Sequence, residues 1–438
     1  MTTSLRRLAA LGMAFAFVAG ACSSGGTATT SPSEEAPSVE PSVEASVAPS
    51  EATFPEGDFS LLLWTKEGEA DGSLQYVQKL AAAYSTVHPN VTIEVVNKDV
   101  EALREDFQTA SLAGEAPDVL WTVADHIGPF TSADLILPLD GLVDKASFVP
   151  AAAAAVTAND TLWGVPVSFG NQLMLYWNKD LAGDAAPADS DAWVAAAKPL
   201  TTGGNYGIVF NQTESFWLFP FLGGYGGQVF AEDGVTPTLD TDAMKSALQF
   251  MYDLKYTDKV TPAEADYNVA DGLFKEAKAA YIINGDWTLN AYAETLGDKL
   301  GVGPLPTMTG GEDPKPYIAG AFLMVGKAVG DDPDRQTVVA DFLNFASNKD
   351  NQVDMVKTLK RLPGNAEAIA DPIVTGDALL AGAAAAAQKG TPQPTNLEMR
   401  CIFDSVTAGV RDMFTGNSDI AGITGTMQTS AETCIAQL

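Results

Sequence analysis

The chain has 438 residues, of which 56 are acidic and 25 are basic, and its formal net charge is −31. This balance argues against nucleic-acid binding, which needs clustered lysine and arginine side chains. The whole chain has two histidines, so a histidine-based metal site is not expected, and no cofactor motif is found. The length suffices for two domains of ordinary size.

Residues 1–21 have the pattern of a secretory signal peptide. Two arginines precede an apolar run, residues 8–18, which is too short for a permanent membrane span. The small residues before Cys22 resemble a bacterial lipobox, although Ala19 stands where most lipoboxes carry leucine. We expect lipid on Cys22 to hold the chain at the outer face of the cytoplasmic membrane, on the cell surface or in the periplasm. Ordinary cleavage that leaves an unmodified cysteine is the alternative.

Residues 22–55 are predicted to form a disordered stalk. Serine, proline, glutamate, alanine and threonine dominate this segment, and aromatic residues are almost absent. Such a composition cannot bury enough apolar surface to offset the entropy of ordering. No later apolar stretch reaches membrane-spanning length, so we expect the lipid anchor to be the sole membrane contact.

Two further cysteines, Cys401 and Cys434, form an even pair in an oxidising compartment. We expect them to form a disulfide, which would contribute roughly 4 kcal/mol in the chain-entropy model. Two unrelated free thiols are the alternative.

The first third of the body alternates between strand and helix patterns. Short apolar or alternating runs predict strands, and apolar residues at helical spacing predict the helices between them. This alternation is typical of a parallel sheet covered by helices. The expected strands are 59–64, 91–96 and 119–121, and the expected helices are 74–88 and 100–113.

The rest of the chain continues this α/β pattern. Its C-terminal part is expected to be helical from residue 378 onward. The other expected strands are 173–177, 280–283 and 320–325, and the other expected helices are 244–254, 267–279, 334–347 and 352–359.

From about Phe59 to the C-terminus the chain resembles the sugar-binding proteins of ABC importers, in particular their maltodextrin-binding branch. Each matching segment is weak alone, but their order and spacing together are specific. The segments that carry the resemblance are 114–119, 162–166, 175–181, 280–287, 303–306 and 361–363.

The resemblance implies a two-lobe periplasmic-binding-protein fold of type II, in which mostly parallel sheets flanked by helices are joined by hinge crossovers. Ligand binding closes such lobes about the hinge. Crossovers are expected near 166–169, 317–322 and 363. The expected lobes are 56–167 plus 321–363 and 168–320 plus 364–438. The implied function is capture of a carbohydrate, a di- or short oligosaccharide, by a monomer that delivers it to ABC permease subunits, with no catalysis.

Sugar rings have apolar faces for aromatic stacking and hydroxyls for carboxylates, amides and guanidinium groups. Trp287, in the turn that begins at Asn284, matches the family position for a stacking ring. Glu67 follows the first strand, at the sheet edge where open α/β sheets bind ligands. The full set of expected ligand contacts is Glu67, Trp121, Thr122, Asp125, Asn171, Glu214, Phe216, Asp286, Trp287, Arg400 and Phe403.

Several of these positions depart from the maltodextrin binders. Asp286 stands where those proteins have an apolar residue, Asn171 replaces a glutamate, and Thr122 replaces a stacking tryptophan. Phe403 takes the place of another tryptophan. These departures leave the identity of the sugar open.

Three other functions remain open. The surplus of carboxylates would suit a cationic solute such as a polyamine, and paired carboxylates in a cleft would suit a glycoside-active enzyme. The same fold would also serve signalling to a receptor. No nucleophile elbow, zinc-protease motif or phosphate loop is found.

Overall fold

The computed structural model describes residues 54–69 and 72–438, which belong to one compact unit. The predicted signal peptide, Cys22 and nearly all of the predicted stalk lie outside these residues. Within the described part, no helix is both long enough and apolar enough to cross a membrane.

The first sheet has five strands in the order β2-β1-β3-β12-β6. Strand β1 pairs in parallel with β2 and β3, whereas β12 is antiparallel to both β3 and β6. The bounds are β1 Phe59–Thr65, β2 Val91–Asn97, β3 Val119–Thr122, β6 Val165–Pro166 and β12 Phe322–Val325.

The second sheet has four strands in the order β10-β7-β9-β8. Strand β9 is parallel to β8 and antiparallel to β7, and β7 is antiparallel to β10. The bounds are β7 Leu173–Asn178, β8 Tyr206–Val209, β9 Ala279–Gly285 and β10 Leu300–Gly303.

As predicted, the strands of each sheet are mostly parallel, and one strand in each, β12 and β7, runs antiparallel to the others. The reason is that the crossovers deliver β12 and β7 to their sheets from the edge at which β3 and β9 end. Phe322 at the start of β12 pairs with Thr122 at the end of β3, and Leu173 at the start of β7 pairs with Gly285 at the end of β9. The α/β class itself is confirmed.

The helices agree with most of the predicted ones. In α2 the side chain of Asp99 accepts the backbone N–H groups of Glu101 and Ala102, and left-handed Gly114 ends the helix. Helix α9 ends four residues earlier than predicted, because Ala277 adopts a positive φ of 55°. The helices of the first half are α1 Ser73–Val87, α2 Val100–Ala113, α3 Ile127–Ser132, α4 Pro150–Ala154, α5 Lys179–Ala182, α6 Ser190–Ala197 and α7 Phe219–Gly224. Those of the second half are α8 Asp242–Tyr256, α9 Tyr267–Lys275, α10 Leu289–Leu296, α11 Pro333–Ser347, α12 Lys349–Leu359, α13 Pro372–Thr375, α14 Ala378–Ala387, α15 Met399–Phe414 and α16 Ile420–Ile435.

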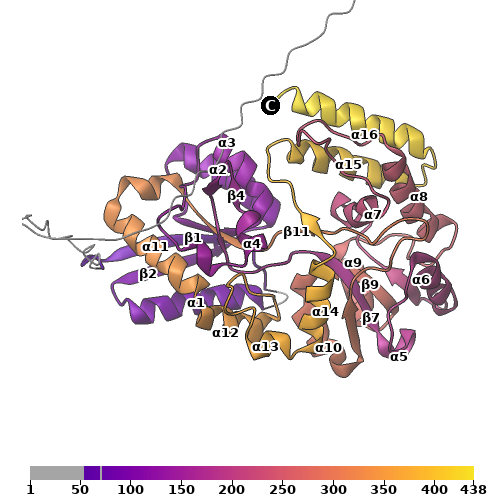
Figure 1. Cartoon of the computed structure of the whole chain (residues 1–438), viewed down its shortest axis with the longest axis horizontal. Helices are drawn as coiled ribbons and strands as arrows, with labels where there is room; N and C mark the ends of the chain where they lie inside the picture. Colours follow the sequence, from indigo (N-terminus) through magenta and orange to yellow (C-terminus); the bar gives the residue numbers. More distant parts are fainter. Residues whose placement is uncertain (1–53, 70–71) are drawn as a thin grey trace, which may run out of the picture. The chain divides into compact units, whose positions relative to one another are not determined.

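Each sheet has its own hydrophobic core. The first core gathers strands β1, β3 and β12 with α1, α2 and α11, and its side chains come from residues 61–167 and 319–359. Two further clusters cover the second sheet, one under α8, α15 and α16 and the other under α10 and α14. Figure 1 shows α1 and α11 beside the first sheet and α5, α6 and α8 in the other half of the unit.

The three predicted crossovers lie side by side between the sheets. Ser168 forms a bridge with Pro363, and Gly170 forms a bridge with Ala319. The Phe169 N–H donates to the carbonyl of Leu362. The connections between the two halves therefore form one hydrogen-bonded group of strands.

The C-terminal helices α15 and α16 pack as a pair and are joined by a disulfide. Cys401 and Cys434 have Cα atoms 5.6 Å apart, and Cys401 is buried. The disulfide holds the last helix against α15, whose other face reaches the cavity described next.

Candidate functional site

A cavity of about 1090 Å³ lies between the two halves. One side is formed by the segments that follow β1 and β3 and by the start of α2. The other side is formed by residues 214–217, the start of α9, residues 287–291 and α15. Loops at the carboxyl ends of parallel strands commonly bind ligands, and β1 and β3 end at this cavity.

Five aromatic residues, called here the aromatic wall, line the side that belongs to the second half. The indole N–H of Trp287 donates to the hydroxyl of Tyr267 at 2.9 Å, and the Trp287 and Phe216 rings have centroids 6.4 Å apart. A Cβ at Gly285 would overlap the Trp287 ring, so glycine is required there. The wall consists of Phe216, Trp217, Tyr267, Trp287 and Phe403.

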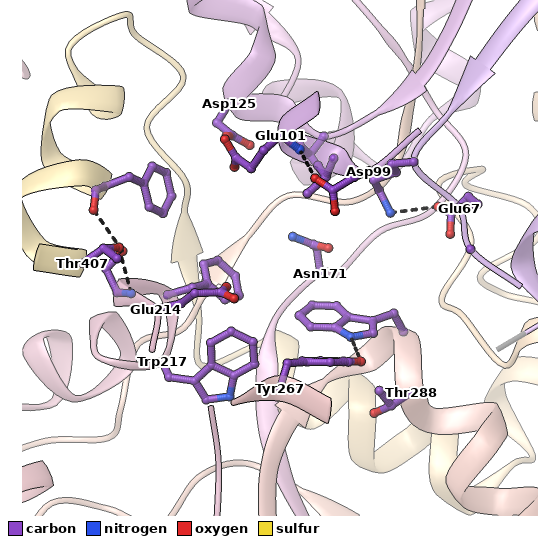
Figure 2. Close-up of a pocket in the computed structure, with 18 of the residues that line it drawn as sticks. Glu67, Asp99, Glu101, Asp125, Asn171, Glu214, Trp217, Tyr267, Thr288 and Thr407 are labelled. Atoms are coloured by element: carbon purple, nitrogen blue, oxygen red, sulfur yellow. Dashed lines mark hydrogen bonds and ion pairs between the residues drawn. The ribbon is translucent and has the colours of Figure 1, made fainter. Parts of the chain in front are cut away.

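The opposite side, called here the polar wall, is formed by Lys66, Glu67, Asp99, Glu101 and Asp125. Figure 2 shows Glu67, Asp99, Glu101 and Asp125 across the cavity from Trp217 and Tyr267. An apolar wall of rings that faces a wall of charged groups suits a ligand with apolar faces and a polar rim.

Glu67 is the most enclosed member of the polar wall, with 2% of its surface exposed. One carboxylate oxygen accepts from Lys66 Nζ at 2.9 Å and from Trp121 Nε1 at 3.0 Å. The other accepts from Arg361 Nη1 at 2.9 Å. Burial alone would raise the pKa of Glu67, but Arg361 and Lys66 outweigh it and hold that pKa well below its ordinary value. Glu67 therefore stays ionised and fixes two cationic side chains at the cavity.

Two other acidic groups of the cavity have pKa values that are raised instead of lowered. Burial raises the pKa of Asp125, although a hydrogen bond from Gln393 and the charge of Arg400 oppose the shift. Burial also raises the pKa of Glu214, although its side chain keeps an exposed surface. Desolvated carboxylates of this kind gain from a ligand that donates hydrogen bonds.

An ion pair crosses the cavity. Arg400 Nη1 on α15 lies 2.6 Å from Glu101 Oε2 on α2, and Arg400 Nη2 lies 2.8 Å from Asp404 Oδ1. The pair joins an element packed on the first sheet to an element packed on the second. It therefore links the two halves directly across the cavity.

Asn171 lies at the centre of the cavity, between the two walls (Figure 2). It belongs to the first crossover and has a positive φ of 58°, which is uncommon outside glycine but tolerated by asparagine. Its backbone N–H donates to the carboxylate of Asp286. The crossover thus presents an amide to any ligand held between the walls.

The structure brings eight of the eleven predicted contact residues together around the cavity. They come from segments that are far apart in the sequence, and both walls contribute. These residues are Glu67, Asp125, Asn171, Glu214, Phe216, Trp287, Arg400 and Phe403.

The other three predicted contacts are buried behind the cavity and do not line it. Trp121 is 1% exposed and donates its indole N–H to Glu67. Thr122 is fully buried, and its hydroxyl lies 2.7 Å from His126 Nδ1. Asp286 is 4% exposed, and its carboxylate accepts the backbone N–H of Asn171. Strand β3 buries both side chains, Trp121 in the first core and Thr122 against His126.

Sequence reasoning missed several lining residues, notably Lys66, Asp99, Glu101, Tyr267 and Arg361. Asp99 and Glu101 follow the parallel strand β2, so the sheet-edge rule that selected Glu67 would have found them. Arg361 begins one of the segments that carry the resemblance, but no local pattern indicates that Arg361 or Tyr267 reaches the cavity, because their positions depend on contacts with distant segments. Within the described residues, no group of three or more histidine, cysteine, aspartate or glutamate side chains is placed to hold a metal ion.

Comparisons with known proteins agree with this geometry. The family described as "Bacterial extracellular solute-binding protein" matches residues 79–382. A galactooligosaccharide-binding protein of Bacillus subtilis (strain 168) is 25% identical over 372 residues, which cover 82% of this chain and 85% of that protein. A maltodextrin-binding protein of the same strain is 25% identical over 356 residues, which cover 78% of this chain and 83% of the relative.

Solved structures extend the likeness to the fold. The maltose/maltodextrin-binding domain from Bdellovibrio bacteriovorus, bound to maltotriose, has a TM-score of 0.81 and 28% identity, covering 86% of this chain and 100% of that one. The Thermus thermophilus maltotriose binding protein has a TM-score of 0.78 and 23% identity, with the same coverage of both chains. The predicted two-lobe fold of type II is confirmed.

Proposed function

Because the chain belongs to the bacterial extracellular solute-binding proteins, we propose that it captures a short oligosaccharide between its two lobes and delivers it to an ABC importer. The relatives named above bind galactooligosaccharides or maltodextrins, which are chains of neutral sugar rings. The proposed ligand is of this class, and its linkage and length are left to experiment.

The aromatic wall facing the polar wall is the observation that carries this proposal. Trp287, Phe216 and Phe403 offer ring faces on which sugar rings stack. Across the cavity, Lys66 and Asp125 offer a donor and an acceptor for the hydroxyl groups of the same rings. A solute without apolar faces would leave the aromatic wall unused.

We assign ligand contact to the eight predicted residues that line the cavity and to Lys66, Tyr267 and Arg361 beside them. The three buried residues of the predicted set act from behind. Trp121 holds Glu67, Thr122 holds His126, and Asp286 holds Asn171.

The proposed setting is outside the cytoplasmic membrane. Lipid on Cys22 and a disordered stalk would tether a monomeric, two-lobed binding unit near its permease, which raises the local concentration of loaded protein. Replacing Cys22 by serine would then release the protein from the membrane fraction, and labelled fatty acid would be incorporated by wild type alone. Equal membrane recovery of both forms would contradict the anchor.

The test of the binding function is a calorimetric screen against maltodextrins, galactooligosaccharides, arabinooligosaccharides and their monosaccharides. A form that contains residues 56–438 is suitable, because the described residues belong to one compact unit. We expect saturable binding of at least one oligosaccharide. If no sugar binds while a solute of another class does, the carbohydrate assignment is wrong.

The main rival ligand is a cationic solute such as a polyamine. The carboxylates of Asp99, Asp125 and Glu214 line the cavity and would bind its amino groups. Its affinity would fall by orders of magnitude between low and high salt, whereas the affinity of a neutral sugar would change by a few-fold at most. Adding spermidine to the same calorimetric series separates the two. Incubating the protein with the sugar that binds, and recovering that sugar unchanged, tests the absence of hydrolysis.

A further inference from the structure

Asp286 is a buried carboxylate directly behind the cavity. It begins the 3-10 turn Asp286–Thr288, whose next residue is Trp287 of the aromatic wall. Its backbone N–H donates to the carbonyl of Gln172 at 3.2 Å, and its carboxylate accepts the backbone N–H of Asn171. Asp286 thus ties β9 to the crossover that carries Asn171 into the cavity.

The side-chain oxygen of Gln172, a hydrogen-bond acceptor, lies on the same side of Gly170 as the Asp286 carboxylate. Its amide nitrogen donates to the carbonyl of Ala383 in α14 at 3.0 Å, which fixes the orientation of the amide. Its Oε1 atom is fully buried, and no described residue donates a hydrogen bond to it. A Cβ at Gly170 would collide with both Gln172 Oε1 and Asp286 Oδ2, so the two oxygens lie against the same glycine.

Two buried acceptors beside the same glycine are stabilised when one of them carries a hydrogen that it can donate to the other. An ionised Asp286 cannot supply one, and its negative charge would face the partial negative charge of Gln172 Oε1. A protonated Asp286 can donate its O–H to Gln172 Oε1 while the carboxyl group still accepts the N–H of Asn171. The geometry therefore favours the protonated form of this carboxyl group.

The groups around Asp286 shift its pKa in both directions. Burial raises the pKa of Asp286 to about 6, against the opposing effects of Arg361, the Asn171 N–H and Lys66. Glu67 adds to the upward shift. The charged and titratable groups that face Asp286 are Arg361, Lys66, Glu67 and Tyr176.

We propose that Asp286 is a positioning residue that acts on the cavity through Asn171. In this proposal, a proton on the Asp286 carboxyl group forms a hydrogen bond to Gln172 Oε1 and so holds the crossover in place. When the proton leaves to solvent, the contact between Asp286 and Gln172 is lost, and the crossover that holds Asn171 loosens. The role of Asn171 toward a sugar rests on the proposed function, but the proton-linked contact itself belongs to the ligand-free protein.

The sign of the effect on stability follows from linkage. A carboxyl group whose pKa is higher in the folded state than in the unfolded chain binds its proton more tightly when folded. Its contribution to stability is complete below the unfolded-state pKa of 3.8 and is lost progressively as pH rises from there to the folded-state pKa of about 6. Asp286→Asn imitates the protonated form, because its amide can donate to Gln172 and accept from Asn171.

The experiment compares the thermal unfolding of ligand-free wild type and Asp286→Asn from pH 3.5 to pH 8. We expect nearly equal melting temperatures at pH 3.5 and a gain for the variant that grows to about 2–5 °C by pH 6 and then stays constant up to pH 8. Asp184→Asn, in the exposed loop after α5, is the matched control and should follow wild type at every pH. A difference between wild type and Asp286→Asn that does not change with pH would overturn the proposal.

A second measurement reads the positioning of Asn171 directly. With selective 15N-asparagine labelling, the backbone amide resonance of Asn171 in wild type should shift with a midpoint near 6, and in Asp286→Asn it should stay constant. In Gln172→Met, which lacks the acceptor, the midpoint should move to lower pH. A wild-type resonance that stays constant between pH 5 and 8 would refute the coupling. Since no ligand is added, this result is independent of whether the protein binds sugar.

Discussion

The two walls of the cavity are held in place by different physical means. The polar wall depends on ion pairs, since Glu67 is ionised and enclosed by Lys66, Arg361 and Trp121. The aromatic wall depends on ring packing, with Trp287 laid on Gly285 and tied to Tyr267 by one hydrogen bond. Substitution in the first should therefore affect mainly folding, and substitution in the second should affect mainly affinity.

The largest effect is expected from Glu67→Ala. Removing this carboxylate takes away the charge that compensates Lys66 and Arg361 in a buried setting, which costs about 3–5 kcal/mol of unfolding free energy. Denaturant unfolding measures the loss. Glu69→Ala, two residues further on at an exposed position, should stay within about 0.5 kcal/mol of wild type. Equal stabilities of the two variants would remove the distinction between the walls.

The second effect is on affinity and belongs to the aromatic wall. Trp287→Ala should weaken the sugar found in the screen by about 30-fold or more, because a central stacking ring contributes about 2 kcal/mol or more. Calorimetry on a folded variant measures this change. Trp287→Phe keeps a ring but loses the hydrogen bond to Tyr267, so its loss should be smaller. If Trp287→Ala binds as wild type does, the site assignment fails.

The polar wall should also lose stability in acid. His126 backs the polar wall, is 1% exposed, and has its pKa lowered by burial to about 3. A base whose pKa is depressed by folding stabilises the protein above its unfolded value, and that stability is lost as pH falls. Between pH 6.5 and 5, wild type should lose about 1.4 kcal/mol per pH unit relative to His126→Asn, as denaturant unfolding at each pH would show. A constant difference would contradict the assignment of a buried neutral histidine.

The smallest effect is expected from the ion pair that joins the walls. Both partners are partly exposed, so the contribution is about 0.5–1 kcal/mol, and Glu101→Gln should weaken sugar affinity by a few-fold at low salt. At high salt the difference from wild type should vanish. Glu105→Gln on the same helix, which contacts Arg104 and not Arg400, is the control. A loss that persists unchanged at high salt would mean that Glu101 contacts the ligand directly.

Local sequence patterns predicted most of the elements. Helix α2 starts after Asp99 and ends at Gly114 because both signals act within a few residues of the helix. The turn after β9 could also be predicted from the sequence, because Gly285 and Trp287 are two residues apart in the chain and in contact in the structure. The crossovers were expected from the resemblance, whereas the mixed pairing of the strands depended on the edge from which each crossover enters its sheet.

What the sequence determined by itself was the set of candidate residues: eight of the eleven predicted contacts line the cavity. The roles of the remainder were decided by tertiary structure, because each depends on a partner far away in the chain. Trp121 meets Glu67 across 54 residues, and Arg361 meets it across 294. Whether a carboxylate is free to bind a ligand depends on which distant donors already saturate its oxygens, and that is set by how the two sheets and their crossovers pack.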